Sequence, residues 1–300
     1  MYMTRITLEF IPESTITIDG FTSTVSKLIL KNVQNYETTI LDIITNNALS
    51  NLTVSPIMSN NKPIYKFQNP RKKSSLVSLY ENKKYVFHVS FLSKNPINEL
   101  QDFLAKNISS SWRISLYNTD ILLAASQVKS VNINELLINI TGDFRVDFIT
   151  PTQFVIKIPM PTTKSWLRLF PLSHTLISSI TSHWNKHVPN EMKIDVENIS
   201  KISYSYIHEA GYHLNPVTIV IRDNSHKHVI RGFIGWCVYK VDERLNLKTR
   251  NVIARLLAYA EFIGVGKGKE MGLGMIKVRP GKIIHETQSE QQEEIIKNIG

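Results

Sequence analysis

The residues best placed to do chemistry lie near the C-terminus, where glycines and lysines alternate. Five glycines fall in the stretch GVGKGKEMGLG, residues 264–274, with two lysines between them. Glycine lets the backbone approach a ligand closely and lysine supplies positive charge, so the pattern is typical of a loop that holds an anion. The predicted anion-binding residues are Gly264, Gly266, Lys267, Gly268, Lys269, Gly272 and Gly274.

Neither of two common phosphate-binding motifs accounts for this stretch. The P-loop motif needs a glycine at position 263 and a serine or threonine after Lys269, whereas the chain has Ile263 and Glu270. The dinucleotide-binding motif runs from strand to glycines to helix, and here we expect the reverse order. A free linker is excluded because apolar residues alternate with the glycines. Two interpretations remain open: a loop that wraps an anion or a nucleic-acid backbone, or a tight structural connection beneath a sheet.

The distribution of charge favours nucleic acid as the anionic partner. The 300-residue chain has a net charge of +10, and residues 226–282 contain twelve lysines and arginines against four acids. A basic segment around a glycine-rich loop is typical of nucleic-acid binding, although a solvated basic face has the same composition.

The remaining composition narrows the class of protein. Cys237 is the only cysteine, so an internal disulfide and a cysteine zinc site are excluded, and its apolar neighbours place it in a core. No apolar run reaches the ~20 residues that span a membrane, and the N-terminal residues lack a signal-peptide pattern. We therefore expect a cytoplasmic protein that needs no membrane and no cofactor.

The elements that position these residues are expected to follow one order twice. The first half predicts strand, helix, strand, strand, helix, strand, which is the split βαβ, ferredoxin-like order. The second half repeats this order without a detectable sequence repeat. We predict an α+β fold of two tandem ferredoxin-like domains with facing antiparallel sheets. The domains are residues 1–142 and 143–280, the second containing the glycine-rich loop 264–274, and residues 281–300 form a tail.

Apolar periodicity and turn residues set the expected boundaries of these elements. The last helix is expected to end at Gly264 in a left-handed conformation. In the first half, strands are expected at 5–10, 51–56, 63–67, 84–91 and 112–117, and helices at 23–34 and 97–106. In the second half, strands are expected at 144–148, 153–158, 216–222, 229–241 and 271–278, and helices at 165–187 and 247–262.

Four short stretches together resemble one family, the CRISPR repeat-RNA processing endoribonucleases of the Cas-six family in the RAMP superfamily. The spacing of two glycine pairs, Gly264-Val-Gly266 and Gly272-Leu-Gly274 with five residues between them, is similar to its glycine-rich loop. The other three stretches resemble its first hairpin, the opening of its second domain and the strand before its last helix. They are Leu52-Thr-Val-Ser-Pro56 with Asn61-Lys-Pro-Ile-Tyr65, then Phe148-Ile-Thr-Pro-Thr152, then Arg231-Gly-Phe-Ile-Gly235.

The resemblance implies a reaction and a set of partners. It implies cleavage of CRISPR repeat transcripts (pre-crRNA) into guide RNAs without a metal, by attack of a 2′-hydroxyl on the adjacent phosphate. The products would carry 2′,3′-cyclic phosphate and 5′-hydroxyl ends. A homodimer is also plausible, because some family members pair to hold unstructured repeats.

The sequence departs from the family at a position that matters for catalysis. Many members place a histidine just after the first helix, but residues 34–52 contain none and the first histidine is His88. Members without that histidine use lysines and arginines, which stabilise charge on the phosphorane and leaving oxygens. Crowded lysines also have lowered pKa values and can move a proton. We predict Lys27, Lys31 and Arg231 as catalytic residues; a solvated helix face is the alternative for the two lysines.

Other polar groups are weaker candidates. Lys227 lies between two histidines in an expected turn and is a candidate RNA contact, with a solvated loop as the alternative. Tyr36 and Tyr65 are candidates for orienting the substrate. His183 and His187 have the spacing of helical metal ligands, but no third ligand is evident in the sequence.

A function from a different class remains open. A non-catalytic RNA-binding protein of the same superfamily would hold repeat or guide RNA in a CRISPR interference complex, and the missing histidine favours it. Replacing Lys27 and Lys31 with alanine distinguishes the two functions, because an enzyme would lose cleavage while retaining most RNA binding.

Overall fold

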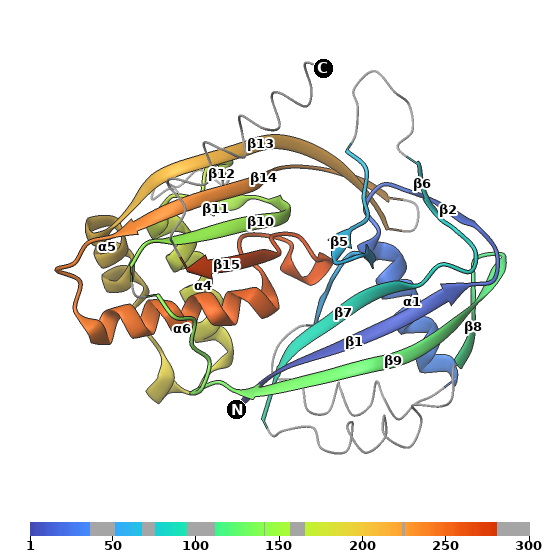
Figure 1. Ribbon diagram of the computed structural model, residues 1–300, viewed down its shortest axis with the longest axis horizontal. Coiled ribbons are helices and arrows are strands. Elements are labelled where there is room, and N and C mark those ends of the chain that lie inside the picture. Colours follow the sequence, from blue (N-terminus) through green and yellow to red (C-terminus); the bar gives the residue numbers. More distant parts are fainter. Residues whose placement is uncertain are drawn as a thin grey trace.

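Two antiparallel sheets lie side by side in the computed structural model, and helices cover one face of each (Figure 1). The structure describes residues 1–36, 52–67, 76–94, 112–140, 142–156, 166–223 and 226–280. The strands of the seven-stranded sheet come from residues up to 132, and those of the four-stranded sheet from residue 144 onward. The predicted fold class, an α+β fold of two ferredoxin-like domains, is confirmed. Their division at residue 142 remains a proposal.

The N-terminal sheet is built around β1, which pairs with β7 on one side and β9 on the other. Side chains alternate along β1, so Ile6, Leu8 and Phe10 face the helix α1 and pack with its Val25 and Ile29. The elements are β1 (Tyr2–Pro12), α1 (Ser23–Tyr36), β3 (Thr53–Val54), β4 (Met58–Ser59), β5 (Lys62–Pro63), β7 (Tyr85–Ser93), β8 (Trp112–Leu116) and β9 (Thr119–Asn132), with β2 (Ile16–Asp19) and β6 (Leu76–Leu79) as a separate pair.

The C-terminal sheet has the strand order β13-β14-β10-β15, which is the ferredoxin-like order. Its core contains aromatic side chains such as Phe144 and Tyr239, whose rings stack 5.1 Å apart, and the buried Cys237. The elements are β10 (Phe144–Thr152), β11 (Phe154–Ile156), β12 (Trp166–Arg168), α4 (Ser173–His187), η1 (Asn190–Met192), α5 (Val196–Tyr206), β13 (Ile207–Asp223), β14 (His226–Val241), α6 (Leu247–Ile263), η2 (Lys269–Met271) and β15 (Ile276–Pro280).

One strand was assigned the wrong place in the first domain. The strand expected at 112–117 exists as β8, but the long strand β9 takes the position beside β1, and β8 lies outside it. A register shift in the β1–β9 pair, between Thr7 and Leu8, interrupts the alternation that would have marked β9 in the sequence. The helix expected at 97–106 lies outside the described residues.

The second domain corrects several boundaries. Residues 166–168 do not begin a helix, because they form β12 and pair with β11, and the helix starts only at Ser173. The strand expected at 144–148 is longer than expected, since β10 continues to Thr152, with a register shift in its pairing with β14 between Phe148 and Thr152. The unexpected helix α5 has a side-chain cap, because Asp195 accepts hydrogen bonds from the next turn. The last strand begins at Ile276, five residues later than expected, because residues 269–271 form a 3-10 turn.

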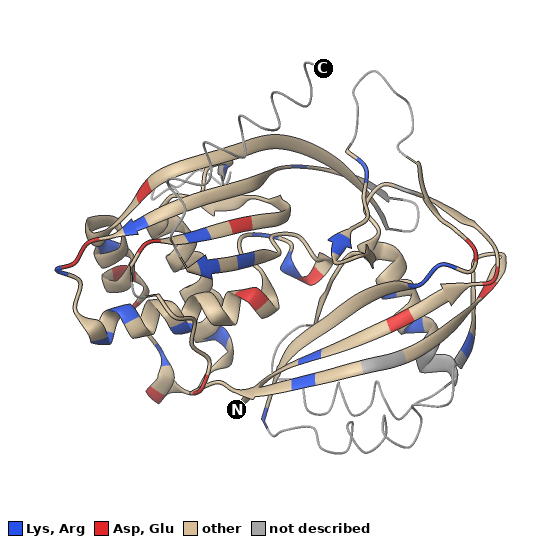
Figure 2. Ribbon diagram, viewed as in Figure 1, with Lys and Arg blue, Asp and Glu red and all other residues tan. Residues whose placement is uncertain are grey.

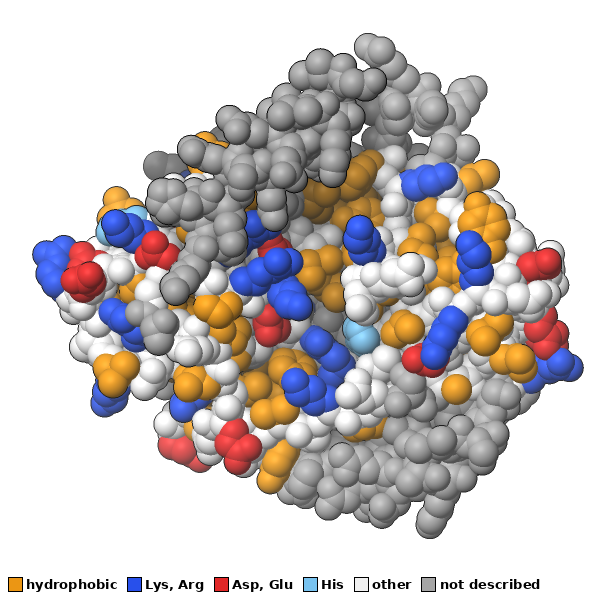
Figure 3. Space-filling view, viewed as in Figure 1, with side chains coloured by type: hydrophobic (Ala, Val, Ile, Leu, Met, Phe, Trp, Pro, Cys, Tyr) orange, Lys and Arg blue, Asp and Glu red, His pale blue; other side chains and the backbone are white. Residues whose placement is uncertain are grey.

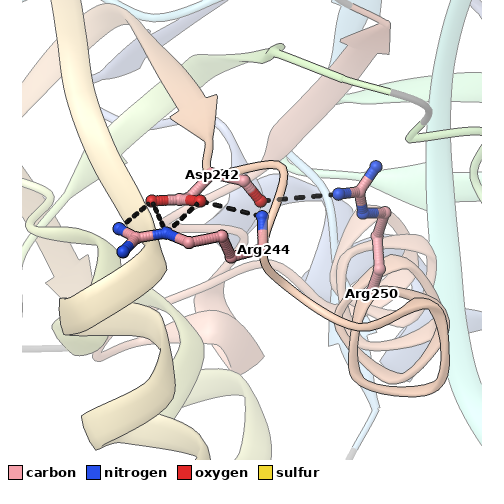
Figure 4. Close-up of polar contacts among 3 residues, drawn as sticks. All are labelled: Asp242, Arg244 and Arg250. Atoms are coloured by element: carbon pink, nitrogen blue, oxygen red, sulfur yellow. Dashed lines mark hydrogen bonds and ion pairs between the residues drawn. The ribbon is translucent and has the colours of Figure 1, made fainter.

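Helix α6 is fixed at both ends, and it therefore sets the start of the glycine-rich loop. Before it, Arg244 donates to the Asp242 carboxylate, which lowers the Asp242 pKa to about 2, and Arg250 donates to the Asp242 carbonyl (Figure 4). The side chain of Asn246 caps the first turn. The helix ends at Gly264 as expected, with φ 80°, but its ψ of −178° is extended rather than left-handed.

No helix within the described residues is both long and apolar enough to cross a membrane.

Candidate nucleic-acid interface

The glycine-rich loop between α6 and β15 is held by the end of β10. Gly274 N donates to the Pro151 carbonyl at 3.1 Å, and Lys267 N donates to the Gln153 carbonyl at 3.0 Å. The hydroxyl of Thr150 donates to the Gly272 carbonyl at 2.8 Å. The stretch FITPT is therefore the support on which the loop folds back.

The other two family-like stretches meet the same support. A Cβ at Gly272 would lie 2.5 Å from the Val54 carbonyl oxygen, so the loop touches the first hairpin of the N-terminal domain. A Cβ at Gly232, in the stretch RGFIG, would lie 2.9 Å from the Thr152 carbonyl oxygen. All four stretches singled out in the sequence, although far apart along the chain, thus converge at the junction of the two domains.

The glycines of this loop serve close packing more than exposure. The N–H groups of Gly264, Gly266, Gly272 and Gly274 all donate to protein atoms, respectively the carbonyl of Ala260, the hydroxyl of Ser179, and the carbonyls of Lys269 and Pro151. Gly266, Gly272 and Gly274 therefore offer no free N–H group to an anion, which the interpretation of an anion-wrapping loop would require. Their positive φ angles let the chain turn back onto β10, as the alternative of a tight structural connection anticipates.

The two loop lysines have different surroundings. Lys267 is exposed, whereas Lys269 is half-buried and its Nζ donates to the Gly266 carbonyl at 2.9 Å. Burial, together with the nearby charge of Lys186, lowers the pKa of Lys269 to about 8, and Glu270 partly offsets this. Lys269 and Lys186 are therefore close enough for their charges to interact.

The predicted catalytic residues lie on elements that border the loop. Phe21, just before α1, packs in one cluster with Leu273 of the loop, so the start of α1 lies next to it. Lys27 is half-buried and Lys31 is exposed on α1, and Arg231 is exposed on β14. Within the described residues, none of these three cations forms a hydrogen bond or an ion pair.

The weaker candidates have mixed outcomes. Lys227 belongs to strand β14, where it pairs with Arg222, rather than to the turn. Tyr36 is the last residue of α1. The hydroxyl of Tyr65 donates to the Ile149 carbonyl at 2.9 Å, and burial raises its pKa to about 12, so it links the first hairpin to β10.

The part of the chain that the structure describes places no further metal ligands beside the histidine pair on α4. His183 Nδ1 lies 2.9 Å from the Tyr259 hydroxyl, which is a hydrogen bond. Among the described residues, no group of three or more histidines, cysteines or acids is arranged to hold a metal ion.

A band of basic residues runs over strands of both sheets on one face of the molecule, around the end of α6, against which Arg5 of β1 packs (Figure 2). Figure 2 shows lysines and arginines on β10, β15, β1 and β9, and Figure 3 shows them gathered over the middle of that face. On β15, exposed Lys277 and Arg279 alternate with buried Ile276 and Val278. The alternation along β15 can be read from the sequence. The continuation of the band onto the N-terminal sheet can be seen only in the structure.

Arg5 is the central residue of this junction, and sequence reasoning missed it. Its Nη2 donates to the Glu261 carbonyl at 2.5 Å and its Nε to the Ser90 hydroxyl at 3.1 Å. Its guanidinium lies 4.6 Å from the centre of the Phe262 ring. Burial lowers the pKa of Arg5, partly offset by Glu261. Arg5 therefore connects β1 directly to the end of α6, from which the loop emerges.

His88 lies beside Arg5 on the same face. Its Nδ1 is 3.1 Å from the Thr7 hydroxyl, and its backbone N–H donates to the Ser55 hydroxyl at 2.8 Å. Burial and the Arg5 charge lower its pKa to about 4, so the imidazole is neutral near pH 7.

Comparison with known families agrees with this geometry. One family model, the Cas6 N-terminal domain, matches residues 4–131, and a second, CRISPR-associated endoribonuclease Cas6, matches residues 146–276. The chain belongs to the Cas6 family. Both matched regions include stretches that converge on the glycine-rich loop, and the family identified from those stretches is confirmed.

Individual relatives are distant in sequence. The chain is 26% identical over 196 residues to CRISPR-associated endoribonuclease Cas6 1 of Saccharolobus solfataricus; the match covers 61% of this chain and 65% of that protein, just under two thirds of its length. A solved Cas6 product complex is 14% identical, with a TM-score of 0.61 over 92% of this chain and 100% of that one. Thermus thermophilus Cas6, also 14% identical, gives 0.56 over 92% and 98%. The two structural similarities support the fold alone.

Proposed function

We propose that this protein is an endoribonuclease that cleaves CRISPR repeat transcripts into guide RNAs. The observation that carries the proposal is the convergence of four separate family-like stretches on the glycine-rich loop, next to the start of α1. Family membership adds support, because a curated relative is named a CRISPR-associated endoribonuclease and a similar solved structure is a Cas6 product complex.

In this proposal the RNA backbone follows the basic band and the glycine-rich loop. Contacts of this kind supply affinity through charge and position the strand without reading its sequence. The glycines shape the loop so that its lysines face the RNA. The proposed RNA-binding residues are Lys227, Gly264, Gly266, Lys267, Gly268, Lys269, Gly272 and Gly274.

The proposed reaction is an in-line attack within the RNA that needs no metal. The 2′-hydroxyl loses its proton and bonds to the adjacent phosphorus, while the bond from phosphorus to the 5′-oxygen breaks and that oxygen gains a proton. The products are a 2′,3′-cyclic phosphate and a 5′-hydroxyl. Lys27, Lys31 and Arg231 stabilise the negative charge on the phosphorane and on the leaving oxygen, and a lysine moves the proton.

Analysis of the product ends tests this proposal. After incubation with its cognate repeat RNA, the downstream product should accept a 5′-phosphate from polynucleotide kinase without phosphatase treatment. The upstream product should accept a 3′ ligation only after its cyclic phosphate has been opened and removed. A downstream product that already carries a 5′-phosphate would contradict the proposed reaction.

A second function is favoured by the absence of histidine between residues 34 and 52. In it, the protein binds repeat or guide RNA without cleaving it and associates with a CRISPR interference complex. Tight binding of repeat RNA with no product after prolonged incubation would favour this function. Size-exclusion chromatography with light scattering, with and without RNA, tests whether the bound form is a homodimer.

A further inference from the structure

A cavity of about 450 Å³ lies between helix α4 and the glycine-rich loop. One wall is a polar face of α4, on which Ser178, Ser182 and Lys186 follow at intervals of four residues. The opposite wall contains Lys267 and Lys269 of the loop. The cavity thus lies on the α4 side of the loop, whereas the predicted catalytic lysines belong to α1.

Hydrogen bonds hold the two walls together. The Gly266 N–H donates to the Ser179 hydroxyl on α4 at 3.1 Å. Lys269 Nζ donates to the Gly266 carbonyl at 2.9 Å, which fixes the ammonium at the cavity wall. His183, which also lines the cavity, is bonded to the Tyr259 hydroxyl of α6. The side chains of Lys269 and His183 are therefore held in place before any ligand enters.

The charge of the cavity is positive and incompletely balanced. Lys186, Lys267 and Lys269 line it, and no carboxylate among the described residues does. Burial and neighbouring cations lower the pKa of Lys269 to about 8 and that of His183 to about 3. Glu270 acts on Lys269 in the opposite direction, but it is a single acid beside three lysines.

We propose that this cavity is a phosphate-binding pocket in which Lys186, Lys267 and Lys269 hold the anion and the hydroxyl of Ser182 donates to its oxygens, whereas the Ser178 hydroxyl already donates to the Thr175 carbonyl. Lysine ammonium groups bind phosphate as point charges, and hydroxyls supply directed donors. A ligand with negative charge would also reduce the repulsion among the lysines. The same donor set disfavours metal cations, since it offers no carboxylate.

Two sources can supply a phosphate group to this pocket. One source is a backbone phosphate of bound RNA. This source rests on the proposed function, because it requires that RNA lie along the glycine-rich loop. The other is a free nucleotide or polyphosphate. The pocket itself does not depend on the nuclease activity, so binding of a simple polyphosphate tests it directly.

Calorimetric titration with tripolyphosphate at constant ionic strength is the first measurement. We expect saturable binding to the full chain, and binding weakened tenfold or more in Lys186→Met/Lys269→Met, because two of three cations are removed. The matched control is Lys193→Met/Lys248→Met, which removes two exposed lysines outside the pocket and should bind within twofold of the unchanged protein.

A second variant separates a loss of phosphate binding from a loss of the fold. Ser182→Glu places a carboxylate among the three lysines at an exposed helical position, so it should preserve the fold and still weaken tripolyphosphate binding tenfold or more. Circular dichroism checks the fold of each variant. Equal affinity in the unchanged protein and in Ser182→Glu, or no binding by the unchanged protein, would overturn the pocket.

Competition with repeat RNA then distinguishes the two sources. If the phosphate comes from RNA, tripolyphosphate displaces labelled repeat RNA, and Ser182→Glu lowers the slope of log affinity against log salt by about 1. If it comes from a free nucleotide, tripolyphosphate binds without displacing RNA. Both results support the pocket, and failure of RNA cleavage leaves the tripolyphosphate result unaffected.

Discussion

Gly272 of the glycine-rich loop lies directly against the backbone of Val54, so that a Cβ at Gly272 would be 2.5 Å from the Val54 carbonyl oxygen. The two residues belong to different domains, and this contact fixes the loop relative to the first hairpin. Gly272 also has a φ angle of 70°, a backbone conformation that is strained for any residue with a side chain. The geometry of the junction therefore depends on the absence of a side chain at this position.

Gly272→Ala should destabilise the protein by about 1–3 kcal/mol, because it combines backbone strain with a clash against another backbone. Chemical denaturation measures the change. Gly142→Ala is the matched control, since a Cβ there meets nothing within 4 Å, and it should leave stability within about 0.5 kcal/mol. Equal effects of the two substitutions would show that the loop is not tightly packed against the hairpin.

Arg5→Met should lower stability by about 2 kcal/mol, because the buried guanidinium makes two hydrogen bonds and lies over Phe262. Thermal unfolding checks this. In contrast, Arg113→Met removes an exposed ion pair to Glu13 and should cost less than about 1 kcal/mol. If the Arg5→Met protein were as stable as the Arg113→Met protein, the contacts of Arg5 between the two domains would not contribute to stability.

Lys27→Ala/Lys31→Ala should reduce single-turnover cleavage of repeat RNA by about 10²-fold or more, while RNA affinity falls by less than tenfold. The reason is that fixed cations act most strongly on charge that develops in the transition state. Lys193→Ala/Lys248→Ala makes the same change in net charge on other exposed surfaces and should preserve the rate. Parallel losses of rate and affinity in the first variant would make the two lysines binding residues only.

His88 makes stability depend on pH. Its pKa falls from 6.5 to about 4 on folding, so the unfolded chain binds the proton more readily and stability is lost as pH falls through this window. The shift corresponds to about 3 kcal/mol as an upper bound. Denaturation between pH 7 and pH 4 should show a flatter profile for His88→Gln than for the unchanged protein; identical profiles would contradict the shift.

Local sequence patterns were sufficient to predict the helices and strands that have a clear apolar periodicity and clear terminal residues. The helix predicted at 247–262 is α6, because one apolar stripe and Gly264 define it. The strand predicted at 84–91 is β7, in which burial alternates from Tyr85 to Val89 and then continues unbroken to Ser93. By contrast, β9 contains a register shift, and residues 166–168 become a strand only because β11 pairs with them. Such pairing is a tertiary effect that no local pattern in the sequence encodes.

The candidate site was predictable only in part for a related reason. Glycine spacing located the loop, but the role of its N–H groups depends on Pro151 and Ser179, which are more than 80 residues away in the chain. Arg5 looked like any polar residue of an alternating strand until α6 was placed beside it. The spacing of Ser178, Ser182 and Lys186 can be read from the sequence. That these residues line a cavity together with the loop lysines can be seen only in the structure.

The most direct test of the central claim is cleavage of a 5′-labelled CRISPR repeat RNA from the same genome, in EDTA, beside a substrate with a single 2′-deoxy sugar at the cut site. Our account predicts one cut that persists in EDTA and disappears with the 2′-deoxy sugar, since that hydroxyl is the nucleophile. A cut that requires a divalent metal, or that persists in the 2′-deoxy substrate, would contradict it.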